Sequence, residues 1–96
     1  MTARLRCLVP YCRRTRGPHK GELPIDEWEE WICGPHWRLV SQATKAEKNE
    51  AFRLFRKAAR ILDPAHREKV LGRLGFRAAR AWEKCKAEAI ERAMGV

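Results

Sequence analysis

The chain has 96 residues, and its 21 Lys and Arg against 12 Asp and Glu give a formal net charge of +9 and a pI near 10.0. A chain of this length forms one small domain, or one with an arm, and often needs a metal or a partner to supplement its core. The charge favours an anionic partner, most often nucleic acid. A hydrophobic fraction of 45% that includes four tryptophans argues against a disordered tail.

No run of apolar residues approaches the length of a membrane span, and MTARLRCLVPYC at the N-terminus lacks the long apolar core of a signal peptide. We therefore expect a cytoplasmic protein with no membrane partner. Because structural disulfides are rare in the cytoplasm, the four cysteines are better interpreted as metal ligands or core residues.

Residues 1–43 are predicted to form a small module of irregular structure. Prolines and glycines recur along it, and GPHKGELP is typical of a turn or an exposed loop. Residues 27–32, EWEEWI, are too few to distinguish a short strand from a single helical turn. From Pro35 the pattern becomes helical, because proline is tolerated in a first turn, where its missing N–H is not needed.

Two pairs of metal-ligating residue types lie in this module, namely Cys7 with Cys12 and Cys33 with His36. Three thiolates and one imidazole form a tetrahedral zinc site, and each pair is close enough in sequence for both side chains to reach one ion. With Pro35 in the first helical turn, Cys33 falls near the N-cap, where free N–H groups favour a thiolate. We therefore predict a structural Zn²⁺ site. His19, between the two pairs, is an alternative ligand to His36.

This spacing resembles the treble-clef zinc modules of small phage and prophage proteins, which often accompany HNH-type endonucleases. The matching residues are Cys7, Val9, Cys12, Cys33, His36, Trp37 and Arg38. The resemblance implies a zinc knuckle, a hairpin and a helix whose first turn supplies the last two ligands. A phage-encoded protein of this kind would lie in the cytoplasm of its host cell.

The resemblance does not extend to catalysis. HNH chemistry needs a histidine base and further His or Asn ligands for a catalytic metal, and only His19 and His66 remain once His36 binds zinc. A zinc ion with four protein ligands also has no open position for water. We therefore expect no enzyme activity, and an HNH-derived nuclease is the least favoured interpretation.

Residues 44–96 are predicted to form three basic helices, over about 45–62, 64–74 and 77–94. Thr44 followed by Glu47 has the form of a capping box that opens the first helix. Asp63 and Pro64 end the first helix and cap the second, and Gly75 is the expected C′ residue of the second. The fold class is therefore mainly α, with a small α+β, treble-clef-like zinc-binding module in residues 1–43. A C-terminal helical bundle or hairpin follows in residues 44–96, packed as one compact unit.

Apolar residues at helical spacing mark the buried faces. In the first helix they are Ala51, Phe52, Phe55, Ala59 and Leu62, and in the last helix Ala78, Trp82, Cys85 and Ala89. Cys85 is interpreted as a small buried hydrophobic residue. Trp28, Trp31 and Trp37 flank the second ligand pair and are expected to supply the core around the metal, with base stacking as the alternative.

A cluster of cations lies opposite the buried face of the first helix, formed by Arg53, Arg56, Lys57 and Arg60. Like charges on one face repel each other, so contact with a phosphate backbone is the favoured explanation, with a solvated surface as the alternative. The further candidate contacts near the ligands are Arg13, Arg14, Arg16 and Arg38. A second basic series on the later helices is formed by Arg73, Arg77, Arg80 and Lys84.

The sequence thus predicts a zinc-stabilised nucleic-acid-binding protein that prefers DNA, in double-stranded form, to RNA and acts as a regulator or accessory factor. The alternative is an adaptor or inhibitor that docks on an acidic surface of a host protein. The oligomeric state stays open, because the apolar faces of the last two helices can build a monomer core or a homodimer interface.

Overall fold

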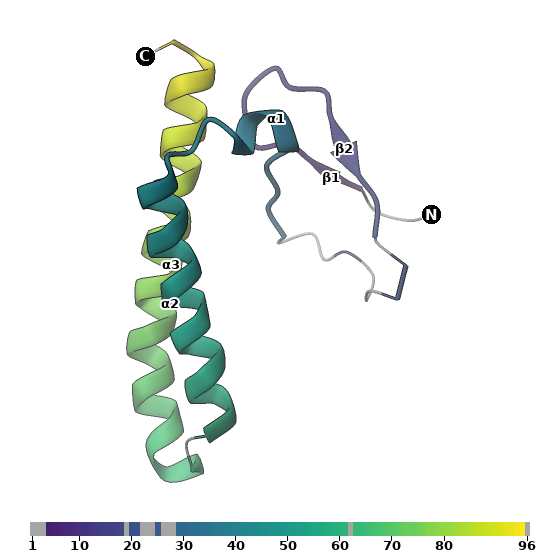
Figure 1. Cartoon of the computed structure of the whole chain (residues 1–96). Helices are drawn as coiled ribbons and strands as arrows, with labels where there is room; N and C mark the ends of the chain where they lie inside the picture. Colours follow the sequence, from purple (N-terminus) through teal and green to yellow (C-terminus); the bar gives the residue numbers. More distant parts are fainter. Residues whose placement is uncertain (1–3, 19, 22–24, 26–28, 62, 96) are drawn as a thin grey trace. The chain divides into compact units, whose positions relative to one another are not determined.

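The computed structural model describes residues 4–18, 20–21, 25, 29–61 and 63–95. The elements in chain order are β1 (Leu5–Arg6), β2 (Thr15–Arg16), α1 (Gly34–Trp37), α2 (Gln42–Ile61) and α3 (Pro64–Ala93). The fold is mainly α with a small α+β N-terminal part, which confirms the predicted class (Figure 1). Within the described residues, neither long helix is apolar enough over a sufficient length to cross a membrane.

The chain divides into two compact units. The N-terminal unit comprises residues 1–39 together with 89–96, and the hairpin unit comprises residues 40–88. The boundary predicted between residues 43 and 44 falls inside the first turn of α2. The assignment of residues 89–96 to the N-terminal unit was not predicted from the sequence.

The β-structure of the N-terminal unit is small. Strands β1 and β2 pair antiparallel, with Leu5 opposite Arg16 and Arg6 opposite Thr15. Beyond this pairing, the N–H of Cys7 donates to the carbonyl of Arg14 at 3.0 Å. Cys7 also forms an isolated parallel bridge with Trp31. This bridge is the only regular pairing among the described residues of the EWEEWI segment, while Trp28 lies outside them.

Helix α2 of the hairpin unit begins earlier than predicted. Ser41 precedes its first residue, and the Ser41 Oγ accepts a hydrogen bond from the N–H of Thr44 at 3.2 Å. The predicted capping box at Thr44 and Glu47 is therefore wrong. Ser41 caps the helix because its short hydroxyl reaches an N–H that has no intrahelical partner, and Glu47 pairs with Lys84 instead.

Helix α3 runs unbroken from Pro64 to Ala93, so the predicted division into two helices at residues 74–77 is wrong. A Cβ on Gly75 would lie 3.4 Å from the ring of Phe55 on α2. Phe55 therefore packs over Gly75, where the helix continues although glycine costs roughly 1 kcal/mol inside a helix. The start of α3 is as predicted, because the Asp63 Oδ1 accepts from the N–H of His66 at 3.0 Å.

Small side chains form the core of the hairpin unit, where α2 and α3 lie side by side (Figure 1). Ala51, Ala78 and Ala81 cluster together, with Phe52 packed against them. The Cys85 side chain has no exposed surface, as predicted, and Ala58 adds a buried residue that the sequence did not mark. Alanines let the helices approach closely, so the core relies on tight contact rather than on large side chains.

Candidate metal centre

The four predicted ligands come together in the N-terminal unit. The ligand atoms of Cys7, Cys12, Cys33 and His36 all lie within 4.8 Å of one another. All the cysteines are free thiols, so no disulfide competes for these sulfur atoms. The cluster can hold a metal ion.

The distances between the ligand atoms suit a tetrahedral ion. The Cys7 Sγ lies 3.5 Å from the His36 Nδ1, and the Cys12 Sγ lies 3.9 Å from the Cys33 Sγ. Metal–sulfur and metal–nitrogen bonds of zinc length predict separations of about 3.5–3.8 Å. The Cys33 Sγ and the His36 Nδ1 are closer, at 3.1 Å. A small outward movement of the His36 ring would bring this last pair into the same range.

A tight turn brings the first two ligands together. The N–H of Cys12 donates to the carbonyl of Val9 at 3.1 Å, with Pro10 and Tyr11 at the corner. Tyr11 has a φ of 68°, in the left-handed region. Proline followed by a residue of positive φ is the pattern of a type II turn. The turn reverses the chain after Cys7 and returns Cys12 to the same site.

Helix α1 supplies the other two ligands. Cys33 is its N-cap, with an extended backbone at φ −65° and ψ 159°, and Pro35 lies in the first turn, as predicted. The Trp37 N–H donates to the Cys33 carbonyl at 2.8 Å. Residues three apart on a helical turn share a face, so Cys33 and His36 are directed to one point.

The thiols have unequal acidities before any ion binds. Burial raises the pKa of Cys7, but hydrogen bonds from the backbone N–H groups of Cys33 and Val9 outweigh it, and the pKa falls from 9.0 to about 7. The Cys33 N–H lies 3.4 Å from the Cys7 Sγ. Burial and the neighbouring Cys7 and Cys12 thiols raise the pKa of Cys33. A bound cation would favour the thiolate form of each sulfur.

A small apolar shell surrounds the cluster. Leu5, Val9 and Ile32 are buried, and Cys33 exposes 1% of its surface. Trp31 and Trp37 are half-buried, which does not decide between a role in the core and base stacking. Cys12 and His36 are also half-buried, so one side of the cluster stays open to solvent. His19, the alternative ligand, lies outside the described residues.

The predicted nucleic-acid contacts lie on the surface. Arg13, Arg14 and Arg38 of the N-terminal unit are exposed, and Arg16 is half-buried with an interaction of its own. We call the exposed cluster on α2 the α2 basic face; its members are Arg53, Arg56, Lys57 and Arg60. By the helical repeat, it lies opposite the buried Ala51 and Ala58. Among the described residues, none of the four pairs with an acidic side chain.

Helix α3 carries a second charged surface, and sequence reasoning missed its shape. A groove of about 620 Å³ is lined by Glu47, Phe76, Arg77, Arg80, Ala81 and Lys84. Phe76 is 66% exposed, and the Arg80 guanidinium lies 5.9 Å from the centre of its ring. The Lys84 Nζ pairs with the Glu47 carboxylate at 3.0 Å. An exposed phenylalanine within a basic series was the available signal for this groove.

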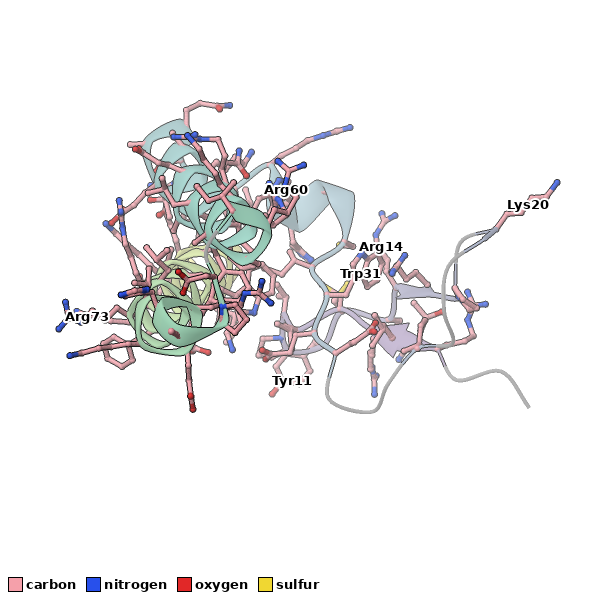
Figure 2. All side chains as sticks on the ribbon, turned by 90° about the horizontal axis from the view of Figure 1, so that it is seen from below. Tyr11, Arg14, Lys20, Trp31, Arg60 and Arg73 are labelled. Carbon is pink, nitrogen blue, oxygen red and sulfur yellow. The ribbon has the colours of Figure 1, made fainter. Side chains whose placement is uncertain are left out.

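The two basic surfaces face different directions. Figure 2 shows Arg60 of α2 and Arg73 of α3 on opposite sides of the helix pair.

Comparisons with known proteins do not assign a family. In a scan against protein-family models, and in searches of curated proteins and of solved structures, nothing matched the chain.

Proposed function

We propose that Cys7, Cys12, Cys33 and His36 hold a structural Zn²⁺ ion. Three sulfur atoms and one imidazole nitrogen at these separations are a donor set that zinc prefers. Four protein ligands leave no open position for water, which supports a structural rather than a catalytic ion. The two-stranded hairpin, the turn at Cys12 and the ligands of α1 also support the treble-clef resemblance.

Elemental analysis tests the ion. Protein purified without added metal and passed through gel filtration should retain about one zinc per chain, as expected for a site with all four ligands from protein. Less than about half an ion per chain would contradict the proposal, and iron or nickel in its place would change the identity of the metal. Cys85→Ala is the matched control, because it removes a cysteine that lies outside the cluster.

The second part of the proposed function is nucleic-acid binding by the hairpin unit, with DNA favoured over RNA. The observation that supports it is the α2 basic face, where four exposed cations lie on consecutive helical turns. Such a face is destabilising by itself, because like charges three and four residues apart repel each other. Contact with phosphates removes the repulsion and releases counterions.

The α2 basic face is a better candidate for a duplex than the groove on α3. In the groove, Lys84 is already paired with Glu47, which reduces the net positive charge there. On the α2 basic face, by contrast, none of the four cations is paired with an acidic side chain among the described residues. Arginine and lysine contacts with phosphates fix orientation but do not read bases, so we expect binding that is largely independent of sequence.

A salt titration tests this part. Binding to a random DNA duplex should be micromolar or tighter at low salt and should weaken steeply as salt rises. Arg56→Glu with Arg60→Glu should lower affinity and reduce the salt slope by about 2, one for each lost phosphate contact. The matched control is Arg73→Glu with Arg77→Glu, which changes the net charge equally on α3.

The outcomes distinguish binding at the α2 basic face from non-specific attraction by the net charge of the chain. Equal losses in the two double variants would mean that net charge, not the α2 basic face, determines binding. Unchanged affinity in the Arg56/Arg60 variant would exclude that face. No binding to DNA or RNA at low salt would overturn the nucleic-acid proposal.

The alternative function, docking on an acidic protein surface, has one specific observation in its favour. Phe76 is an exposed apolar residue with Arg77 and Arg80 beside it in the groove. An aromatic anchor within a polar rim is typical of protein interfaces. In that case Phe76→Ala would abolish partner binding, while the Arg56/Arg60 variant would have a smaller effect through charge alone.

A further inference from the structure

The turn between the first two metal ligands has an unusual corner residue. Tyr11 follows Pro10, and the turn closes with the hydrogen bond from the Cys12 N–H to the Val9 carbonyl. Tyr11 adopts a φ of 68°, which makes it the sole non-glycine residue of positive φ within the described residues. This position of a type II turn favours glycine or asparagine, because a Cβ there crowds the backbone.

Among the described residues, no hydrogen bond, ion pair or ring contact of the tyrosine side chain compensates for this strain. Tyr11 is 91% exposed, the highest value among the large hydrophobic residues that the structure describes. Its side chain is labelled in Figure 2. The turn itself needs only a residue that tolerates positive φ, and glycine would form it at lower cost. Strain without burial is typical of a residue that contacts a partner.

The charge around Tyr11 indicates what that partner is. The first 21 residues contain six basic side chains and no acidic one: Arg4, Arg6, Arg13, Arg14, Arg16 and Lys20. Of these, Arg13 lies two residues from Tyr11 and is exposed. An aromatic ring on a purely cationic segment matches a ligand with a flat π-face and a negative backbone, which is the chemistry of a nucleotide chain.

We infer that Tyr11 is a stacking platform for an unpaired nucleobase, and that the segment around it binds single-stranded nucleic acid. The bases of a duplex are already stacked and paired, so their faces are not available to a side chain. The two ligands that flank the turn, Cys7 and Cys12, would hold the ring in place before the strand arrives. This inference rests on the proposed nucleic-acid binding and names the form of nucleic acid that the N-terminal unit takes.

Three substitutions at one position test the inference in the zinc-loaded full chain. Tyr11→Gly and Tyr11→Asn keep a turn that needs positive φ but remove the ring. Tyr11→Phe keeps the ring and its strain. The probes are a fluorescent oligothymidylate of about 15 nucleotides, long enough for several stacking and phosphate contacts, and a random duplex of equal length.

The expected result combines two opposite effects. Tyr11→Gly and Tyr11→Asn should weaken oligothymidylate binding by about 5- to 100-fold, the usual loss for one stacked base, while Tyr11→Phe binds like the parent. Duplex affinity should change less than twofold in all three variants, since the charges are unchanged. Tyr11→Gly should also raise the melting temperature by a few degrees, because the strain is removed.

Several outcomes would overturn the inference. Parental oligothymidylate affinity in Tyr11→Gly would show that the ring does not stack. Lower zinc retention and a lower melting temperature in both the glycine and the asparagine variants would show that the ring supports the fold. If the parent binds duplex but not oligothymidylate, the inference fails while the proposed function stands. If the parent binds neither, the proposed function fails with it, and an acidic protein becomes the partner to test.

Discussion

Different interactions stabilise the N-terminal unit and the hairpin unit. The first buries Leu5, Val9 and Ile32 around four ligand atoms and has two strands of two residues each. The second packs two long helices through a close-fitting core of alanines and Cys85. With the proposed ion bound, the first arrangement would depend on one strong, localised interaction, whereas the second depends on many weak ones spread along the helices. The two units should therefore respond to different perturbations.

Removal of the proposed zinc ion should have the largest effect, and this effect should be confined to the N-terminal unit. Structural zinc contributes about 10–16 kcal/mol of apparent binding free energy, far more than so small a core supplies. Chelation, or Cys33→Ser, should therefore expose the Cys7 and Cys12 amides to rapid hydrogen exchange. The amides of α2 should stay protected, because that helix packs through its own core. Slow exchange of the Cys7 amide after complete zinc removal would show that the N-terminal unit does not depend on the ion.

Overpacking of the hairpin core should have the reverse effect. Ala51 is buried between the helices, so Ala51→Leu should destabilise the hairpin unit by about 1–3 kcal/mol. Zinc content should stay the same. Ala46→Leu, on the exposed side of α2, is the matched control and should change stability by less than about 0.5 kcal/mol. Thermal unfolding with zinc analysis measures both, and zinc loss in Ala51→Leu would show that the units are coupled.

A smaller effect is expected where one carboxylate joins the two helices. Glu88 on α3 accepts from the Ser41 N–H and from the Thr44 hydroxyl, both at 2.6 Å. Glu88→Gln leaves one acceptor oxygen in place of two and removes the charge, which should cost about 1–2 kcal/mol. Glu91→Gln, on the exposed side of the same helix, should cost close to nothing. Equal stability of the two variants in chemical denaturation would exclude a contribution from the Glu88 contacts.

The smallest expected effect depends on pH at the start of α3. A side-chain hydrogen bond with His66 lowers the pKa of Asp63 below its ordinary value of 3.8. A carboxyl group whose pKa is lowered by folding stabilises the folded state above its unfolded pKa, and that stability is lost as pH falls through the folded pKa. The protection of the His66 amide, measured as its exchange rate relative to that of an unstructured peptide at the same pH, should therefore fall below about pH 4. Asp63→Asn keeps a capping side chain and should remove this local pH dependence.

The clustering of the four candidate ligands was predictable from the sequence because the spacing within each pair is a local property. Each pair, Cys7 with Cys12 and Cys33 with His36, is brought together within one turn of the chain. Residue type and sequence separation are therefore nearly sufficient to predict the cluster. The N-cap position of Cys33 followed from Pro35 for the same reason. The buried state of Cys85 followed from the helical period, which the rest of α3 preserves.

The features that the sequence did not predict depend on contacts between distant residues. Gly75 resembles the end of a helix until Phe55, twenty residues earlier, is seen against it. Thr44 resembles a cap, but its hydroxyl donates a hydrogen bond to Glu88, and Ser41 caps the helix instead. The strain at Tyr11 requires a backbone angle, which a single sequence does not give. In each case the local preference was real, and a tertiary contact or the turn geometry decided the outcome.

The division of the chain also has a consequence for biosynthesis. Residues 89–95 belong with residues 4–39, and the Arg92 guanidinium donates to the Leu39 carbonyl. The ribosome makes those two segments at opposite ends of the hairpin unit, since synthesis runs from the N-terminus. All four candidate ligands emerge early, so the proposed ion could bind while the helices are still being translated. The N-terminal unit nevertheless acquires its last contacts only after the hairpin has been made, and no single cut in the chain yields the two units as separate fragments.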